Sequence, residues 1–288
     1  MTSLGCVGAN LVPVSFDDLS RPPLDPAALS AALVKEGSTW SSVDVLPRAT
    51  STNALLSDRA RAGTSTPGAV LVADHQSEGR GRLDRVWVTP PGSALTFSVL
   101  LAPDRVATQR WPWLPLLAGI AVSEGLRRVT GVECTLKWPN DVLVGERKLA
   151  GVLVERVETR TGPVAVVGVG INVSLTDDEL PVPTATSLAL EGGSTTDRTV
   201  ILREVLRSLE ALYLQWQADE GDATRGLLDS FVRRCSTLGR EVRVALPTGE
   251  QLYGEATGID ADGRLEVRGP QGSRTLGAGD VVHVRAVD

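Results

Sequence analysis

The pattern of apolar residues changes near residue 237, and this change constrains the fold more than any other feature of the chain. Upstream, short apolar runs such as Ala69–Ala73 alternate with stretches in which leucines and valines recur at helical spacing. Downstream, Glu241–Val287 consists of short alternating runs broken by glycine-containing turns, which is typical of a small β-barrel. We therefore expect an α+β domain over residues 25–236, with a mixed β-sheet and helices on one face, and a β-barrel domain over residues 237–288. Residues 1–24 show no periodicity and are expected to form a loose tail.

Composition excludes several classes of protein. Apolar side chains make up 42% of the 288 residues, which suffices for a buried core and argues against global disorder. The net charge of −6 argues against a general nucleic-acid binder, and no apolar stretch is suited to cross a membrane as a helix. Three scattered cysteines and two histidines offer neither a disulfide framework nor metal-ligand spacing. We therefore expect a cytoplasmic protein that holds no metal of its own.

The segment Gly79–Trp87, here called the arginine loop, places Arg80, Arg82 and Arg85 within six residues. These guanidinium groups repel one another and the glycines leave the backbone flexible, so the loop lacks a counter-charge that an anionic ligand can supply. Guanidinium groups suit phosphate and carboxylate oxygens, and glycine permits close approach of the backbone. The alternative is an exposed, solvated loop without a ligand.

A second cluster combines a lysine, an amide and a carboxylate in Lys137–Asp141, and another lysine follows in Lys148–Gly151. Only three of the 29 basic residues are lysines, and two of these lie in this stretch, which indicates chemistry that needs a compact ammonium group. On a two-stranded ribbon these side chains can face one cleft. The alternative is a charged hairpin whose Asn-Asp turn is merely structural.

A third motif, Gly168–Asn172, carries two glycines on an expected strand. It lacks the third glycine and the directly following helix of a dinucleotide-binding fingerprint. A strand with two close backbone approaches explains the motif equally well, so on its own it indicates little.

Together, four segments resemble in order and spacing the motifs of the biotin–protein ligases: GRGRxxRxW in Gly79–Trp87, KWPND in Lys137–Asp141, KLAG in Lys148–Gly151 and GxGxN in Gly168–Asn172. The resemblance extends from about Val43 to the C-terminus. It implies a catalytic domain with the fold of class II aminoacyl-tRNA synthetases and biotin ligases, followed by an SH3-like β-barrel.

The resemblance also implies a reaction. Enzymes of this family join the carboxylate of biotin to the α-phosphate of ATP, release pyrophosphate, and transfer biotin from the adenylate to a lysine of a biotin carboxyl carrier domain. ATP and biotin are thus the expected substrates, with Mg²⁺ carried on the phosphates. A carboxylate that attacks a polyphosphate needs concentrated positive charge nearby, which the arginine loop and the two lysines supply.

Positions that match the family's motifs carry its site residues over to this chain. By this resemblance biotin is bound by Ser51, Thr52, Asn53, Gln76, Gly79, Arg80, Gly81, Arg82, Lys148 and Gly151. ATP and the adenylate are bound by Arg85, Trp87, Lys137, Asn140, Gly168, Gly170 and Asn172. Ser51 is alternatively the N-cap of the following helix, and the two roles are compatible.

Three residues are candidate catalytic groups. By the resemblance, Lys148 and Arg82 act on the biotin carboxylate and the adenylate phosphate, where Lys148 polarises the acyl centre. Asp141 is the candidate that accepts a proton from, or orients, the incoming lysine amine, because only the neutral amine attacks. The alternative is an aspartate that pins the turn by accepting hydrogen bonds from backbone amides.

Other readings of the chain stay open. Some family members carry an N-terminal DNA-binding domain, but the 47 residues before Arg48 hold two basic and five acidic residues, so we expect the single-function type without a nucleic-acid or membrane partner. Lipoate–protein ligases and octanoyl transferases share the catalytic fold, although the arginine loop and the KWPND segment favour biotin. A non-catalytic biotin or nucleotide sensor would need neither Lys148 nor Asp141. Two loops, Gln76–Trp87 and Gly145–Arg147, are expected to become ordered when ligands bind.

Overall fold

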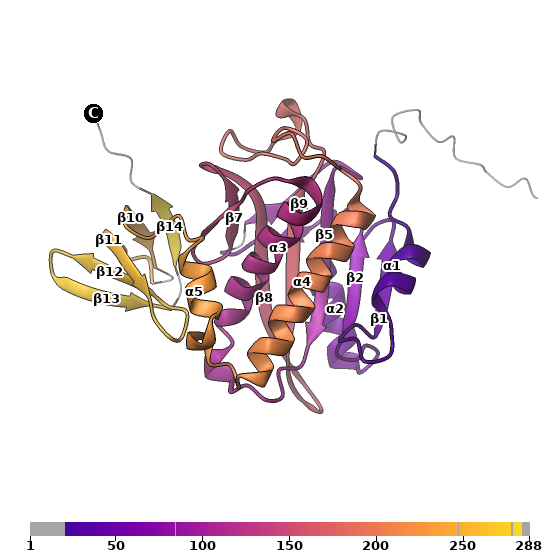
Figure 1. Ribbon diagram of the computed structural model, residues 1–288, viewed down its shortest axis with the longest axis horizontal. Coiled ribbons are helices and arrows are strands. Elements are labelled where there is room, and N and C mark those ends of the chain that lie inside the picture. Colours follow the sequence, from indigo (N-terminus) through magenta and orange to yellow (C-terminus); the bar gives the residue numbers. More distant parts are fainter. Residues whose placement is uncertain (1–20, 84, 247, 278, 284–288) are drawn as a thin grey trace, which may run out of the picture.

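The computed structural model describes residues 21–83, 85–246, 248–277 and 279–283 (Figure 1). The α-helices are α1 (Pro26–Leu33), α2 (Thr52–Ala62), α3 (Trp113–Thr130), α4 (Arg198–Ala218) and α5 (Leu227–Val232). The strands are β1 (Ser42–Leu46), β2 (Ala69–Ala73), β3 (Gly79–Arg80), β4 (Val86–Trp87), β5 (Ala94–Leu101), β6 (Thr135–Lys137), β7 (Asp141–Val144), β8 (Arg147–Thr159), β9 (Gly162–Asn172), β10 (Glu241–Ala245), β11 (Gln251–Ile259), β12 (Leu265–Gly269), β13 (Gly272–Leu276) and β14 (Asp280–His283). Within the described ranges, no helix combines the length and apolar character needed to cross a membrane.

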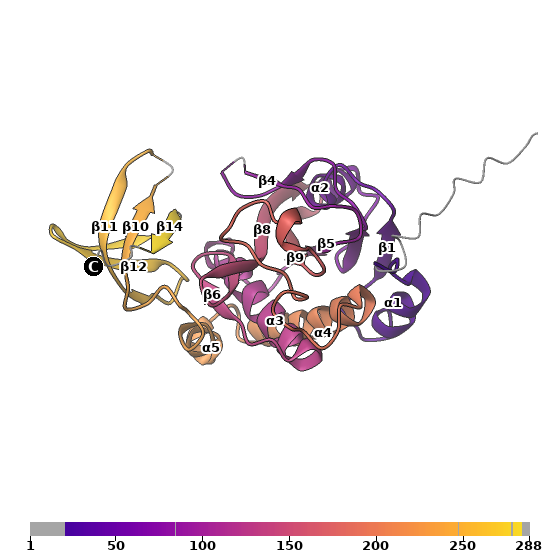
Figure 2. The same ribbon diagram turned by 90° about the horizontal axis from the view of Figure 1, so that it is seen from above.

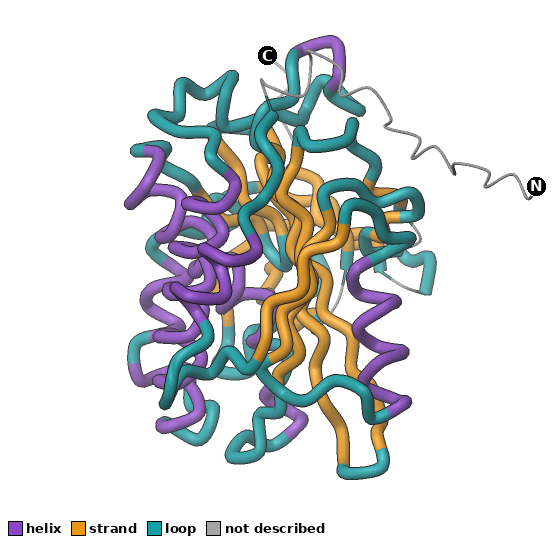
Figure 3. Tube along the Cα trace, turned by 90° about the vertical axis from the view of Figure 1, so that its right-hand side faces the viewer, coloured by secondary structure: helices purple, strands orange, loops and turns teal. Residues whose placement is uncertain are grey.

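Seven strands form one mixed sheet in the order β1-β2-β5-β9-β8-β7-β6. β1 and β2 are parallel, and the other neighbouring strands are antiparallel, which confirms the expected α+β class. The helices α1, α3 and α4 cover one face of the sheet, whereas α2 lies on the opposite face (Figures 2 and 3). The expectation that the helices lie on one face is therefore wrong for α2.

The alternation of side chains along the central strands explains why both faces are covered. On β9, Val167 and Val169 join the main core, whereas Val164 and Val166 join a smaller cluster with Leu56 of α2. Successive strand residues point to opposite faces, so a continuous apolar run has two faces to bury. The helix α2 buries the second face along part of its length.

The local sequence determines where α2 begins and ends. Ser51 has an extended backbone and its hydroxyl accepts a hydrogen bond from the Ala54 amide at 3.4 Å, as expected of an N-cap. Gly63 ends the helix in the left-handed conformation, with φ of 72°. Because Ser51 caps the helix, Thr52 and Asn53 lie in its first turn and are buried against the sheet.

The C-terminal strands form a second sheet at one side of the molecule (Figure 1), antiparallel throughout and in the order β13-β12-β11-β10-β14. This sheet confirms the expected all-β C-terminal domain. Its apolar interior is continuous with the main core of the first sheet. The indole N–H groups of Trp113 and Trp138 donate to the carbonyls of Ala261 and Gly263 at 2.7 and 3.0 Å, so the two sheets are joined by polar as well as apolar contacts.

We propose that the boundary between the two domains lies at residues 236/237. Cys235 still forms a β-bridge with Leu136 at the edge of the first sheet, and the second sheet begins with β10 at Glu241. The last residues of the expected C-terminal domain, 284–288, lie outside the described part of the chain.

The loose tail expected over residues 1–24 needs correction at its last four residues. Leu24 is buried in the main core, and the Arg21 guanidinium donates to the carbonyl of Ser174 at 3.0 Å. This segment is therefore held by burial of an apolar side chain and by a charge-assisted hydrogen bond. Residues 1–20 lie outside the described part of the chain.

Candidate active site

A cavity of about 810 Å³ lies between the sheet face that carries α2, the arginine loop and strand β14 of the C-terminal domain. The predicted site residues that line it are Ser51, Thr52, Asn53, Gln76, Arg80, Gly81, Arg82, Arg85, Trp87, Lys137, Asn140, Asp141, Lys148, Gly151, Gly168, Gly170 and Asn172. Gly79 does not line the cavity but pairs with Trp87 in the hairpin β3–β4. A Cβ atom at Gly79 would lie 2.2 Å from the carbonyl oxygen of Trp87, so this glycine allows the two strands of the hairpin to pair closely.

Part of the cavity floor is bare backbone. The strand register pairs Thr96 with Gly170, Gly170 with Gly151, and Gly151 with Asp141, so these residues form one row on the same face of the sheet. The two central glycines leave the sheet surface without side chains. The ring of Trp87 lies against this surface, and a Cβ atom at Gly170 would lie 2.6 Å from it. Gly170 of the Gly168–Asn172 motif therefore allows another group, here the Trp87 ring, to lie directly against the sheet.

Buried, uncharged side chains form a polar cluster at the α2 end of the cavity. Gln76 Oε1 accepts hydrogen bonds from the Thr52 backbone N–H at 2.7 Å and from Thr52 Oγ1 at 3.1 Å. Ser98 Oγ donates to Asn53 Oδ1 at 2.6 Å, and Asn53 Nδ2 donates to Glu155 at 2.8 Å. Buried polar groups are stable only with partners, so these bonds hold the cluster in one arrangement. Such an arrangement suits a neutral, polar ring.

Ser98 was missed by the motif analysis, although the sequence contains a signal for it. Thr96 and Ser98 alternate with apolar residues on β5, and this alternation indicates a strand with one polar face. Gly168 lies opposite Ser98 in the register of β5 and β9. A Cβ atom at Gly168 would lie 2.1 Å from Asn53 Oδ1, so this glycine provides the space that Asn53 occupies.

Cationic side chains gather at the other end of the cavity. Lys148 Nζ lies 2.6 Å from Asp141 Oδ1 and 5.7 Å from the ring centroid of Trp87. Lys137 opposes Asp141 in the register of β6 and β7. Burial lowers the pKa of both Lys137 and Arg82, and the Asp141 carboxylate only partly counteracts this effect. Partly buried cations that outnumber the nearby carboxylates favour the binding of an anion.

Two asparagines that were predicted to bind ATP are engaged by the protein itself. Asn140 Oδ1 accepts a hydrogen bond from Arg82 Nη1 at 3.2 Å, while its Nδ2 donates to the Val152 carbonyl at 2.9 Å. Asn172 is buried, and its Nδ2 donates to the Thr186 carbonyl at 2.8 Å. Asn140 therefore orients the Arg82 guanidinium, and Asn172 fixes the backbone beside the cavity.

The C-terminal domain contributes to the cavity, which the motif analysis did not foresee. The Arg85 guanidinium forms a two-pronged ion pair with the Asp280 carboxylate on β14, and Arg85 Nη1 lies 3.1 Å from Asp280 Oδ1. The hydrogen bond that Arg85 donates to the Asp280 carboxylate raises the pKa of Arg85. Val282 and His283 also line the cavity. No local pattern signals this contact, because Arg85 and Asp280 are 195 residues apart.

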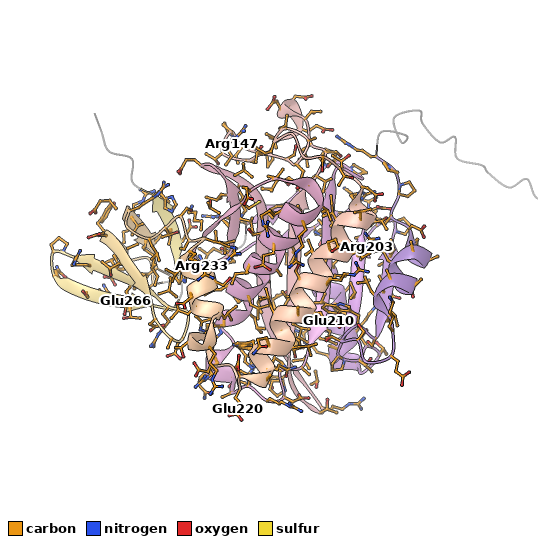
Figure 4. The ribbon with its side chains drawn as sticks, in the orientation of Figure 1. Arg147, Arg203, Glu210, Glu220, Arg233 and Glu266 are labelled. Carbon is orange, nitrogen blue, oxygen red and sulfur yellow. The ribbon has the colours of Figure 1, made fainter. Side chains whose placement is uncertain are left out.

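The connection between β9 and α4 passes beside Lys148. The Lys148 amide donates to the Thr184 carbonyl at 2.7 Å, and the Thr186 amide donates to the Lys148 carbonyl at 2.9 Å. Arg147 lies beside this connection (Figure 4) and forms an ion pair with Glu191 at 2.8 Å. The backbone of Lys148 is thus held between β7 and this connection, which fixes where its side chain begins.

Sequence comparisons define the class of protein to which this fold and cavity belong. The model of the Biotin/lipoate A/B protein ligase family matches residues 45–172, and that of the Biotin protein ligase C terminal domain matches residues 237–284. The Biotin--[acetyl-CoA-carboxylase] ligase of Mycobacterium tuberculosis is 41% identical over 93% of this chain and 98% of that protein. The Bifunctional ligase/repressor BirA of Escherichia coli is 34% identical over 78% of this chain and 68% of that protein.

A solved structure gives the same result for the fold. The biotin protein ligase from Aquifex aeolicus in complex with biotin and ATP superimposes with a TM-score of 0.72 and 29% identity. The match covers 86% of this chain and 100% of that chain. The chain therefore belongs to the biotin protein ligase family.

Proposed function

We propose that this chain is an ATP-dependent ligase that activates biotin as biotinyl-5′-AMP and transfers it to one lysine of a carrier domain. One observation carries this proposal: a single cavity has a buried neutral polar cluster at one end, cations at the other, and between them two glycines of the sheet against which the Trp87 ring lies. This arrangement fits a molecule with an uncharged ring and a carboxylate tail that must meet a phosphate. The relatives support it, because one is named for biotin ligation and another was solved with biotin and ATP.

In the first step the ends of biotin are held by different chemistry. The neutral ureido ring binds at Thr52, Asn53 and Gln76, whose hydrogen bonds already fix their positions. The carboxylate tail extends toward the Lys148 ammonium and the Arg82 guanidinium. Because the two ends of biotin are bound separately, the carboxylate is aligned with the incoming phosphate. The two anions then react within one complex and need not meet by collision.

Adenylation then requires neutralisation of the triphosphate. Arg85 and Lys137 lie at the charged end of the cavity and can pair with phosphate oxygens, and Mg²⁺ enters on the phosphates. Gly151 and Gly170 provide the space in which the Trp87 ring lies on the sheet, so this ring, which contacts the nucleotide in our proposal, forms part of the cavity floor. Positive charge that is fixed in advance stabilises the developing charge on the α-phosphate and on the departing pyrophosphate.

The transfer step follows from the ion pair between Lys148 and Asp141. When the adenylate engages the Lys148 ammonium, Asp141 loses its partner and becomes the free carboxylate beside the acyl centre. A carboxylate in that position can orient the carrier lysine or accept its proton, since only the neutral amine attacks. The amine forms the amide bond to biotin, and AMP leaves with the electron pair of the broken acyl–phosphate bond.

We further propose that the acceptor is the biotin carboxyl carrier domain of a carboxylase and that the reaction takes place in the cytoplasm. The name of the mycobacterial relative supports a carboxylase as partner. Of the described cysteines, Cys134 and Cys235 are both free and buried, which fits a reducing compartment.

One experiment tests the function and its nearest alternative together. The chain is incubated with ATP, Mg²⁺, a carrier domain and either biotin or lipoate, and the carrier is then weighed by mass spectrometry. We expect the mass of one biotinyl group to be added and no lipoyl group. Lipoylation of the carrier would assign the chain to the sister group of ligases, and an unmodified carrier in both reactions would contradict a ligase function.

A further inference from the structure

Arg198, the first residue of α4, forms a buried ion pair that no motif predicts. Its side chain is 4% exposed, and among the described residues no other charged side chain is buried as deeply. Arg198 Nη1 lies 2.8 Å from Asp74 Oδ1, and Arg198 Nη2 donates to the carbonyl of Pro22 at 2.8 Å. The guanidinium thus links α4, the N-terminal segment and the end of β2.

Asp74 is the residue at which the chain leaves β2 and turns toward the cavity. Its amide donates to the Leu46 carbonyl at 2.9 Å, and its carbonyl accepts from the Gly92 amide at 3.1 Å. Gln76, which holds Thr52, follows two residues later. The backbone at Asp74 therefore sets where the segment that carries Gln76 begins, and the bridge between Ala49 and Gln76 holds its other side.

We propose that Arg198 and Asp74 act as a positioning pair that holds Gln76 in the geometry required by the ring of biotin. This inference rests on the proposed function, because it assigns the polar cluster to the biotin ring. Neither residue lines the cavity, so both act through Gln76.

The chemistry of the pair suits this role. A buried guanidinium without its carboxylate is strongly unfavourable, so the two groups hold each other in place. The Arg198 guanidinium is itself fixed by donating to the carbonyls of Pro22 and Ala94, so the charge that Asp74 faces has a defined position. Gln76 Oε1 accepts two hydrogen bonds from Thr52, both of which lengthen if the loop shifts by a fraction of an ångström.

The test compares Asp74→Asn, Arg198→Met and the double variant in biotin-dependent release of pyrophosphate. We expect each single variant to raise the KM for biotin about tenfold while the KM for ATP stays within about twofold of wild type. The double variant should resemble the single variants, because two residues that act as a unit do not add. Asp74→Asn preserves the shape of the side chain and keeps the test valid if Arg198→Met does not fold.

The variant Arg234→Met is the matched control. Arg234 also pairs with a carboxylate in a half-buried setting, at 3.1 Å from Glu124, but it lies outside the cavity. We expect this variant to lower the melting temperature and to leave the KM for biotin unchanged.

Three outcomes would overturn the inference. In the first, the Asp74 and Arg198 variants lower only the melting temperature, as the control does. In the second, they raise the KM for biotin and the KM for ATP equally. In the third, their effects on the KM for biotin multiply in the double variant. A wild-type chain that releases no pyrophosphate in the presence of biotin would instead overturn the proposed function, and the inference with it.

Discussion

Lys148 Nζ and Asp141 Oδ1 lie 2.6 Å apart on adjacent strands, so the cation predicted to polarise the acyl centre is paired with the carboxylate predicted to serve the incoming amine. On the sequence alone, Asp141 could equally be an aspartate that merely pins a turn. The contact with Lys148 gives its carboxylate a partner other than a backbone amide. The two residues are therefore expected to exchange partners in the course of the reaction, and their variants should separate its two steps.

Substitution Lys148→Ala removes the ammonium group beside the predicted position of the biotin carboxylate. We expect the rate of biotin-dependent pyrophosphate release to fall by about 100-fold or more, because one fixed charge is lost from the transition state. Lys35→Ala removes an exposed lysine that does not line the cavity and is the matched control, with an expected rate equal to wild type. Pyrophosphate release at the wild-type rate from Lys148→Ala would remove this residue from the adenylation step.

Substitution Asp141→Asn keeps the size of the side chain but removes its charge. Adenylate formation should stay close to the wild-type rate, because Lys148 and the arginines remain. Transfer from preformed biotinyl-adenylate to the carrier should slow by about 100-fold, since the carboxylate that orients or deprotonates the amine is lost. The two half-reactions are measured separately, by pyrophosphate release and by single-turnover labelling of the carrier. Equal slowing of both would show that Asp141 serves only to hold Lys148 and the turn.

Substitution Gly168→Ala tests whether Asn53 in the polar cluster takes part in binding biotin. The new Cβ atom would lie 2.1 Å from Asn53 Oδ1, so Asn53 must move and its bond with Ser98 must lengthen or break. We expect the KM for biotin to rise about tenfold and the free energy of unfolding to fall by about 1–3 kcal/mol. Gly119→Ala on α3, where the new atom meets Leu136 at 3.4 Å, is the control that should leave the KM for biotin unchanged. An unaltered KM in Gly168→Ala would argue against a role of Asn53 in binding biotin.

The buried position of Lys137 predicts a pH dependence of ATP use. Burial lowers its pKa from the ordinary value of 10.5, the carboxylates of Asp141 and Asp280 counteract this, and Lys148 and Arg85 lower it further. The charged ammonium is present below this pKa and is lost above it. The value of kcat/KM for ATP should therefore fall as the pH rises through the lowered pKa, at a lower pH than for an ordinary lysine. Lys137→Arg should shift this decline to higher pH, and an unchanged alkaline limb in that variant would exclude Lys137 as its cause.

The sequence predicted the floor and the charged end of the cavity well, because the residues involved form short local motifs. Gly168 and Gly170 share one face of β9 by simple alternation, and Lys137 and Asp141 share one hairpin, so spacing alone brings each pair together. Ser98 was within reach of the same argument, since polar and apolar residues alternate on β5.

Other parts of the site depend on contacts between distant segments and carry no local signal. Arg85 meets Asp280 only because the C-terminal sheet packs beside the first one, and Arg198 meets Asp74 only because α4 begins at the end of β2. The layer formed by α2 was missed for a related reason. Strands such as β9 are apolar on both faces, which indicates burial but does not reveal which helix covers which face.

The contacts of Trp113 and Trp138 determine which part of the molecule can move when substrates enter the cavity. Both indoles are bonded to the C-terminal sheet within one continuous apolar interior, so swinging that sheet aside would expose aromatic rings to water. The arginine loop is held by polar contacts, the ion pair of Arg85 with Asp280 and the hydrogen bond from Arg82 to Asn140, while Leu83 and Val86 at its rim are 53% and 70% exposed. A shift of this rim would therefore uncover no buried apolar side chain, whereas a shift of the C-terminal sheet would.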